Sequence, residues 1–309
     1  DTIRLELCRC RECFSKFRTP PYKSATDWYL LTQNAIRKKL DEQGWYNSFG
    51  WISYHGSEDP PNHVRLYEKG RNMDFLYAPR PRGGTQHGPL NNEHPLSFKY
   101  RQNLKAWLDY LDAQDYKGTL TVFEYYYDLI LLGYLAEGRT FLIPKQGAMQ
   151  EDMRFYHQRG FDGFFDCNPP SDAWFPDPLS RWIYHLLMWD LDLDLKSSQD
   201  DFFKHYYGPA ADVVKESREA VEKLMFEEPS QKVVDELHSL EARFDIASSI
   251  ASGDKIFVTR IEGMRLWVQY CALCKDSEFH AKVTHDFEKG RATEQAIRKL
   301  LNDNKDFLI

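Results

Sequence analysis

The chain has 309 residues, 42% hydrophobic and 28% charged, which excludes a disordered protein and allows one large domain or two ordinary ones. Its formal net charge is −7, and no basic stripe or tail interrupts the mixed charges, which argues against nucleic acid as the main partner. No segment is apolar over the length that a membrane span requires. Aromatic residues make up 15% of the chain. This content mildly favours a protein that binds ligands with flat apolar faces, such as sugars.

The first part of the chain alternates strand and helix patterns. Apolar runs predict strands at Thr2–Cys8, Phe49–His55, Met73–Pro79, Thr119–Tyr125 and Phe161–Cys167. Amphipathic periodicity predicts helices at Ala25–Glu42, Phe98–Leu111, Met149–Gln158 and Trp174–Trp189. Strands separated by helices indicate parallel βαβ units.

The chain opens with DTIRLELCRC, which is typical of a strand already under way and carries no signal peptide. The sequence is either a processed form or, as we expect, a fragment whose N-terminal part is missing.

After about Leu195 the pattern changes, and from Asp200 to the end only helical periodicity is found. The segments predicted as helices are 209–226, 231–252, 255–277 and 284–303, separated by breaks at Gly208-Pro209, Pro229-Ser230 and Gly253-Asp254. The pattern predicts two domains, residues 1–195 and a helical domain at residues 196–309.

Two architectures accommodate five parallel strands. A doubly wound sheet normally carries a glycine-rich turn after its first strand, and none of the predicted strands is followed by one. The predicted strands instead end in polar or aromatic groups, and (β/α)8 barrels build their active sites at such strand ends. We expect an α/β fold, the C-terminal part of a TIM barrel with about five βα units, followed by an α-helical region.

Glu124 is the first candidate for catalysis. It follows the apolar run LTVF, at the expected end of a buried strand, and glycosidases work with a pair of carboxylates. Asp166, at the end of the fifth predicted strand, is the best-placed second carboxylate, ahead of Glu6, Asp128 and Glu93. The competing interpretation is a structural carboxylate held by an arginine or a tyrosine.

Other side chains near the strand ends suit a sugar ligand. Arginine hydrogen-bonds hydroxyl and carboxylate groups, and aromatic rings stack on sugar faces. On this basis the predicted substrate-binding residues are Tyr54, His55, Arg80, Tyr126 and Trp174. For His55 and Arg80 a purely structural role is the competing interpretation.

The cysteines near the N-terminus indicate a metal site or a disulfide. CRCREC places Cys8, Cys10 and Cys13 close together, and three thiolates suit a structural zinc ion that Cys167 or a histidine would complete. A disulfide between two of them is the alternative in an exported protein. Cys271, within a helical pattern, is predicted to be a buried core thiol together with Cys274.

Several segments in order carry a resemblance to a known family. C-x-C-x-x-C, SYH, YAPR, FEYYYD, DMRFYHQRGFDGF, LMWD and DFFKHYYGPAA follow one another between roughly Ile3 and Ala211. This order is similar to a bacterial family first catalogued as a domain of unknown function, found downstream of hexosaminidase-like domains. Part of that family became glycoside hydrolase family 163, the endo-β-N-acetylglucosaminidases that act on N-glycans.

The resemblance implies a barrel related to hexosaminidases and α-glucuronidases, a carbohydrate substrate, export from the cell, and retaining hydrolysis by two glutamates without a cofactor. Of the strand-end residues only Glu124 matches such a glutamate; His55 and Arg80 stand at other strand ends. Either the second acid lies in the missing N-terminal part, or this chain differs in substrate or has no hydrolase activity. The alternatives to a hydrolase are a non-catalytic carbohydrate-binding protein on a degenerate barrel and a catalytic metal centre at CRCREC.

Overall fold

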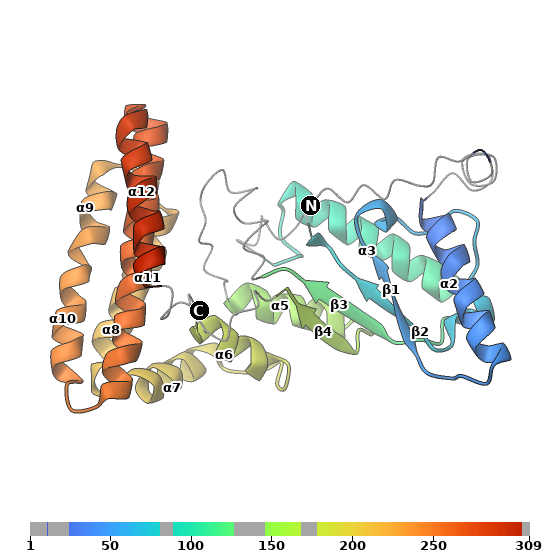
Figure 1. Cartoon of the computed structure of the whole chain (residues 1–309). Coiled ribbons are helices and arrows are strands. Elements are labelled where there is room, and N and C mark those ends of the chain that lie inside the picture. The colour runs from blue at the N-terminus through green and yellow to red at the C-terminus, as the bar shows by residue number, and fades with distance from the viewer. Residues whose placement is uncertain (1–10, 12–24, 81–88, 127–145, 168–177, 305–309) are drawn as a thin grey trace. The chain divides into compact units, whose positions relative to one another are not determined.

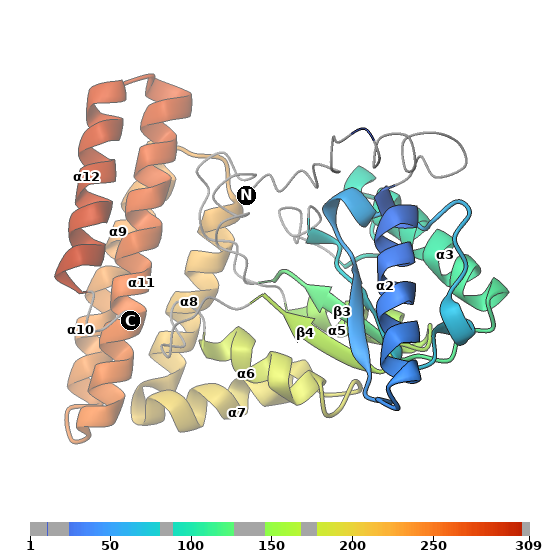
Figure 2. The same cartoon turned by 45° about the vertical axis from the view of Figure 1, so that its right-hand side comes forward.

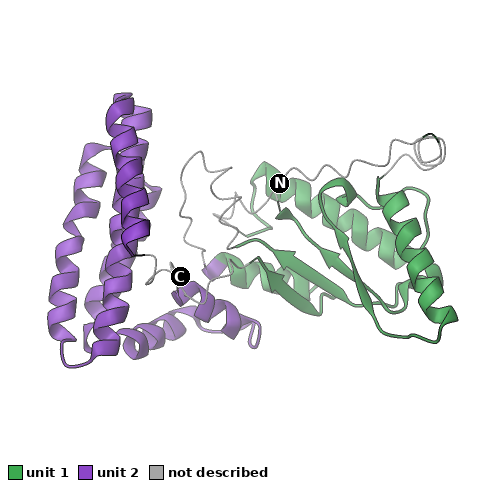
Figure 3. Ribbon diagram, viewed as in Figure 1, with its two compact units in different colours: residues 1–128, 148–168 green, residues 129–147, 169–309 purple. Residues whose placement is uncertain are grey.

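The computed structural model describes residue 11 and residues 25–80, 89–126, 146–167 and 178–304 (Figure 1). The chain divides into two compact units, residues 1–128 with 148–168 and residues 129–147 with 169–309 (Figure 3). Each unit is considered by itself.

Unit 1 is an α/β unit. Its elements are α2 (Ala25–Glu42), β1 (Phe49–Ser53), the 3-10 turns η1 (His55–Ser57) and η2 (Tyr67–Gly70), β2 (Met73–Tyr77), α3 (Pro95–Ala113), β3 (Leu120–Glu124), α5 (Gln146–His157, from Ala148 on) and β4 (Gly163–Asp166). The four strands are parallel and lie in chain order, β1-β2-β3-β4. Because parallel neighbours that follow one another in sequence need a crossover, α3 and α5 connect the later strands.

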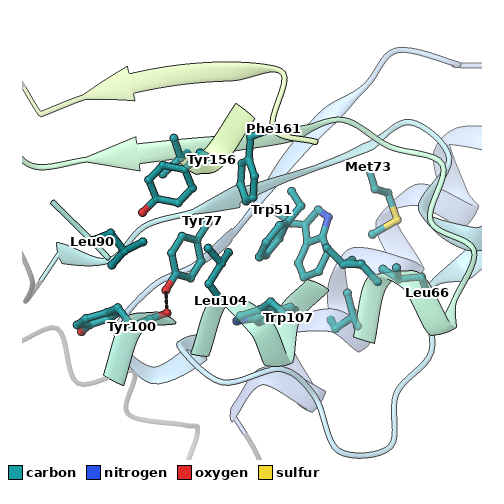
Figure 4. Close-up of a cluster of buried hydrophobic side chains, with 14 of the residues drawn as sticks. Trp51, Leu66, Met73, Tyr77, Leu90, Tyr100, Leu104, Trp107, Tyr156 and Phe161 are labelled. Atoms are coloured by element: carbon teal, nitrogen blue, oxygen red, sulfur yellow. Dashed lines mark hydrogen bonds between the residues drawn. The ribbon is translucent and has the colours of Figure 1, made fainter. Parts of the chain in front are cut away.

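One face of this sheet packs against the helices. Side chains alternate along a strand, so Trp51, Phe75, Tyr77 and Val122 share a face, which we call the helix face. They join a buried cluster (Figure 4) to which the helices add Leu30 from α2; Tyr100, Leu104, Trp107 and Leu111 from α3; and Tyr156 from α5. The Tyr77 hydroxyl donates a hydrogen bond to the Tyr100 carbonyl oxygen at 2.9 Å, fixing α3 to the sheet.

The opposite face, which we call the second face, carries Ile52, Leu76, Phe123 and Phe165. Among the described residues, none of these four side chains belongs to the buried cluster or packs against it. The Phe165 side chain is 55% exposed. The helices of unit 1 therefore cover one side of the sheet in the described part of the chain.

The predicted α/β alternation with parallel strands, followed by a helical region, is confirmed. Four of the five predicted strands form the sheet, and the predicted strand Thr2–Cys8 lies outside the described residues. The helix predicted at Phe98–Leu111 is longer, because Pro95 occupies its first position and the His94 ring nitrogen accepts a hydrogen bond from the Leu96 N–H at 3.2 Å. The barrel itself is not shown.

Unit 2 is helical in its described part. Its elements are α6 (Pro178–Leu187), α7 (Leu195–Tyr207), η4 (Gly208–Ala210), α8 (Ala211–Phe226), α9 (Gln231–Ser239), α10 (Glu241–Ile250), α11 (Lys255–Phe279), the π-helical turn η5 (His280–Thr284) and α12 (Phe287–Asp303). Helix α12 packs along the long α11 (Figure 2). Helix α6, which lies within residues 1–195, belongs to unit 2.

One helix of this region was not predicted, and one predicted helix is wrong in its extent. Helix α7 was not predicted, although Asp194 caps it by accepting a hydrogen bond from the Ser197 N–H. The single helix predicted at 231–252 is two, because the chain leaves α9 after Ser239, whose hydroxyl donates to the Glu236 carbonyl oxygen at 2.7 Å. No glycine or proline marks this break, so the pattern continues through it.

No helix in the described part of the chain combines the length and the apolar character needed to cross a membrane.

Candidate functional site

The carboxyl ends of β1 to β4 place polar and aromatic side chains at one edge of the sheet. Parallel strands all end at the same edge, which is where open and closed α/β sheets bind their ligands. The side chains at this edge form two groups, because successive residues of a strand point to opposite faces.

The first group lies on the helix face and centres on Glu124, whose side chain is 0% exposed. The Tyr156 hydroxyl, from α5, donates a hydrogen bond to Glu124 Oε1 at 2.8 Å. Glu124 is the register partner of Asp166 on β4, and the Cys167 N–H donates to the Glu124 carbonyl oxygen at 2.9 Å. Glu124 and Asp166 are therefore neighbours across two strands.

Tyr126 extends this group. Its N–H donates to Asp166 Oδ1 at 2.9 Å, and its hydroxyl donates to Asp152 Oδ2 at 2.7 Å. The buried Asp152 also accepts a hydrogen bond from the Leu90 N–H. We call Glu124, Tyr126, Asp152, Tyr156 and Asp166 the helix-side network; it ties α5 to the ends of β3 and β4.

The second group joins the ends of β1, β2 and β3, and we call Tyr54, His55, Arg80 and Tyr125 the strand-end aromatic cluster. Arg80 Nη1 donates to the Tyr54 hydroxyl at 2.8 Å. The Tyr54 ring stacks on the Tyr125 ring with centroids 6.3 Å apart and planes 13° apart. The Arg80 guanidinium carbon lies 5.9 Å from the centre of the Tyr125 ring, within cation–π range.

Tyr125 shows which face this cluster occupies. Its ring centroid lies 5.0 Å from that of Phe123, two residues earlier on the same side of β3. Phe123 belongs to the second face, so the cluster lies on the side of the sheet away from Glu124. Burial, with the nearby Tyr54 and Cys167, raises the pKa of the Tyr125 phenol above its ordinary value, so this hydroxyl stays protonated.

His55 completes the cluster. Its ring contacts the Tyr54 ring edge-on, with centroids 4.0 Å apart, and its backbone φ of 48° lies in the left-handed region. Burial and then the Arg80 charge lower the pKa of His55 below the ordinary value of 6.5, while Glu58 opposes them. The Nε2 atom is buried and has no hydrogen-bond partner among the described residues, so neutral His55 retains one hydrogen-bonding position for a ligand.

The structure brings the predicted residues together in two sets rather than one. Glu124, Tyr126 and Asp166 form one set, and Tyr54, His55 and Arg80 the other, on opposite faces of the sheet edge. Trp174, the remaining predicted sugar-binding residue, and the predicted zinc ligands Cys8, Cys10 and Cys13 lie outside the described residues, as do Glu6 and Asp128. Glu93 is exposed in the segment that precedes α3.

Three residues of the site were not predicted. Tyr125 was not among the predicted residues, although strict alternation places it with Phe123 on the second face. Asp152 and Tyr156 stand four residues apart in α5, a spacing that puts both on one helix face. That spacing was the available signal, but the sequence did not show that this helix face packs against the end of the predicted strand at Thr119–Tyr125.

Within the described ranges, no three histidine, cysteine, aspartate or glutamate side chains are grouped closely enough to hold a metal ion. Cys271 and Cys274 are buried in α11, 0% and 8% exposed, which confirms their prediction as core thiols. Burial raises the pKa of the Cys271 thiol well above its ordinary value, so it is a poor nucleophile and a poor metal ligand.

Fold and site together define an α/β protein with a parallel sheet, a polar and aromatic carboxyl edge, and a following helical region. The chain belongs to the family described as Domain of unknown function (DUF4838), whose model matches residues 4–218. This match confirms the domain-of-unknown-function part of the resemblance; the link to glycoside hydrolase family 163 stays a prediction. No curated protein and no solved structure matches the chain.

Proposed function

We propose that this chain is part of an exported glycoside hydrolase that cleaves a glycosidic bond in a glycan or polysaccharide. In this proposal the carboxyl edge of the sheet binds the sugar, and Glu124 and Asp166 supply the two carboxylates of a retaining mechanism. Glu124 acts as nucleophile or general acid.

The proposed architecture is the later part of a (β/α)8 barrel. A doubly wound sheet reverses its strand order and carries helices on both faces. Here the strands run in chain order, and the described helices of unit 1 pack on one face. These two features support a barrel wall, whose second face, with Phe123 and Phe165, would point to the barrel interior.

The strand-end aromatic cluster supports a sugar as the ligand. Tyr54 and Tyr125 offer stacked rings, Arg80 offers guanidinium N–H donors, and His55 offers a neutral ring nitrogen. Flat apolar faces beside a few directed polar groups are the usual composition of a small-molecule site. The rings and the polar groups of this cluster match the C–H faces and the hydroxyls of a pyranose.

The observation that carries the hydrolase proposal is the pairing of Glu124 with Asp166 across β3 and β4. Neighbouring strands lie about 4.8 Å apart, and register partners of a parallel pair project to the same face. A retaining glycosidase holds its two carboxyl groups about 5–5.5 Å apart. The sugar has to reach this pair over the strand ends, because the helix face is closed by Tyr156.

The test is hydrolysis by the full-length protein carrying Glu124→Gln or Asp166→Asn. We expect both variants to lose about a hundredfold or more in kcat on a released N-glycan or a 4-nitrophenyl N-acetyl-β-glucosaminide, while their Tm stays near the wild-type value. The matched control is Asp109→Asn, an exposed carboxylate on α3 paired only with Lys105 in the described structure, which should keep full turnover. Wild-type turnover in Glu124→Gln would refute the assignment.

A second candidate function is favoured by the burial of Glu124. Its side chain is 0% exposed and accepts the Tyr156 hydroxyl, the arrangement of a structural anchor between β3 and α5. In that case the chain is a non-catalytic carbohydrate-binding protein that uses the strand-end aromatic cluster alone. Glu124→Gln would then lower Tm without changing glycan affinity, and Arg80→Met would abolish binding without lowering Tm to the same extent.

We further propose that Cys8, Cys10 and Cys13 hold a structural zinc ion and that catalysis needs no cofactor. Metal analysis of the purified full-length protein should find about one zinc per chain, and the triple change of these cysteines to serine should remove it. Glycan turnover that persists after zinc removal would agree with a structural role. Finding no zinc, with two of the thiols oxidised, would replace the metal by the disulfide alternative.

A further inference from the structure

Unit 2 contains a pocket that the proposed reaction does not use. Its volume is about 510 Å³, within the range of sites for small organic ligands. Three of its residues are aromatic and three are polar: Trp182 from α6, Asp201, Phe202, His205 and Tyr206 from α7, and Arg260 from α11. All belong to unit 2, and we call these six residues the α7 pocket.

The wall of the α7 pocket is a layered stack. The Phe202 and Tyr206 rings lie parallel, with centroids 4.8 Å apart and planes 15° apart. The Arg260 guanidinium lies over the Tyr206 ring, 4.2 Å from its centre. Arg260 Nη1 also donates to the Tyr206 carbonyl oxygen at 3.0 Å, which fixes the guanidinium in place.

Trp182 lies on the unburied side of α6. Its neighbours Arg181 and Ile183 are buried, whereas the Trp182 side chain is 38% exposed and lines the pocket. An indole held partly in solvent beside a cavity offers a flat face to a ligand without taking part in the core.

Asp201 and Arg260, the carboxylate and the guanidinium of the α7 pocket, form no ion pair with each other in the described structure. Asp201 is paired with His205, Nδ1 to Oδ1 at 3.2 Å, whereas no carboxylate among the described residues lies within ion-pair distance of Arg260. A fixed guanidinium beside aromatic faces suits a carboxylate of a ligand. The nearby Asp201 carboxylate opposes a doubly charged phosphate more than it opposes a single carboxylate.

We propose that the α7 pocket binds an acidic sugar, a pyranose ring that carries a carboxylate. The ring stacks on Trp182, the carboxylate accepts hydrogen bonds from Arg260, and Asp201 and His205 bind ring hydroxyls. The pocket is then a second glycan-binding site on the helical unit. The choice of a sugar over another ring acid rests on the proposed function, and the choice of an acidic one rests on Arg260.

The test is calorimetric titration of the full-length protein with trigalacturonate and with its fully methyl-esterified form. The two probes share rings and linkages and differ only at the carboxyl groups, which are charged in the first and methyl-esterified in the second. We expect trigalacturonate to bind at least about tenfold more tightly than the ester, since loss of a charge-assisted hydrogen bond costs at least that much. Equal affinity for both probes, or binding of neither, overturns the proposal.

Variants locate the binding. Trp182→Ala should weaken trigalacturonate binding about tenfold or more, Trp182→Phe should restore part of it, and Arg260→Met should remove the preference over the ester. The controls are Trp189→Ala, a tryptophan that is 94% exposed and does not line the pocket, and Lys255→Met, an exposed cation at the start of α11. Equal losses in the controls would overturn the assignment to this pocket.

The two proposals fail separately. Binding that depends on Trp182 in a protein that hydrolyses no glycan would support the α7 pocket and refute the hydrolase. Hydrolysis that depends on Glu124, together with no binding of trigalacturonate, would do the reverse.

Discussion

Unit 1 and unit 2 are each stabilised internally by a different kind of polar contact. In unit 1 the polar side chains fix segments that are far apart in the sequence. The carboxylate of Asp27 on α2 accepts hydrogen bonds from the N–H groups of His63 and Val64 at 2.9 and 3.0 Å. The Tyr116 hydroxyl accepts from the Phe75 N–H at 2.9 Å, joining the segment before β3 to β2.

In unit 2 many of the polar contacts are local. Ser230, Asp254 and Asp286 cap the helices that follow them. Ion pairs at i,i+4 spacing, such as Lys232 with Glu236, run along the helix surfaces. Such contacts form within one helix and do not need a distant strand to be in place.

The two units therefore position the residues of their candidate sites in different ways. In unit 1 the register of a sheet brings Glu124 to Asp166, and a hydrogen bond between the ends of two strands brings Arg80 to Tyr54. In unit 2 the α7 pocket depends on four residues of a single helix, α7, with one residue each from α6 and α11. A substitution in the sheet core should therefore disturb the carboxyl edge more than a helical substitution disturbs the pocket.

The largest expected effect is in the aromatic core of unit 1. Trp107 is 0% exposed, its ring lies 4.8 Å from that of Phe75, and its indole N–H donates to the Glu58 carbonyl oxygen. Trp107→Ala should lower the free energy of unfolding by about 4 kcal/mol, measured by urea denaturation. The control Trp45→Ala removes an indole that is 62% exposed and should cost less than about 1 kcal/mol. Similar losses in the two variants would contradict a buried aromatic core.

A smaller loss is expected from the buried cation of unit 2. Lys275 is 1% exposed, and its ammonium group donates to Glu278 Oε2 at 3.1 Å and to the carbonyl oxygens of Met225 and Glu227 at the end of α8. Lys275→Met should cost about 3 kcal/mol, because it removes the ammonium donor from the carbonyl oxygens of Met225 and Glu227 and one of the cations beside Glu278, which keeps Lys282.

The measurement is again urea denaturation, with Lys232→Met, whose side chain is 84% exposed, as the control at an expected cost below about 0.5 kcal/mol. A stabilised Lys275→Met protein would show that apolar packing outweighs these hydrogen bonds. The buried hydrogen bonds of Lys275 would then contribute less to the stability of unit 2 than an apolar side chain at the same position.

The smallest effect concerns pH at the strand-end aromatic cluster. Burial and Arg80 hold the pKa of His55 below 6.5, so the unfolded chain takes up this proton at a higher pH than the folded one. Stability from neutral His55 is therefore complete above about pH 6.5 and is lost as the pH falls through the folded pKa. Arg80→Met should move the NMR titration midpoint of the His55 ring upward.

Lys117→Met serves as the control, because Lys117 is an exposed cation that pairs with Asp115, and it should leave the midpoint in place. A midpoint that stays or falls in Arg80→Met would mean that Arg80 does not face His55 in solution.

Local chemistry made much of the fold predictable. Alternating apolar runs located four strands, and the dipeptide Gly208-Pro209 marked the end of α7, where Gly208 adopts a φ of 57°. The helix break after Ser239 carries no glycine or proline, and α7 begins at Leu195, after its cap Asp194, without either residue, so the sequence predicted neither the break nor this helix. Periodicity records which residues are apolar, and it does not record where a regular helix stops for packing reasons.

The candidate site, like the fold, could be predicted from the sequence only in part. The sequence by itself determined that Glu124, Asp166, Tyr54 and Arg80 stand at strand ends, because strand composition and its polar termination are properties of neighbouring residues. Only the tertiary structure decided that Glu124 faces Tyr156 and Asp152 belongs to the same network, while Tyr125 joins Arg80 on the other face. The face that a strand residue takes follows from which neighbour its strand pairs with and which helix covers it, and those partners lie tens of residues away.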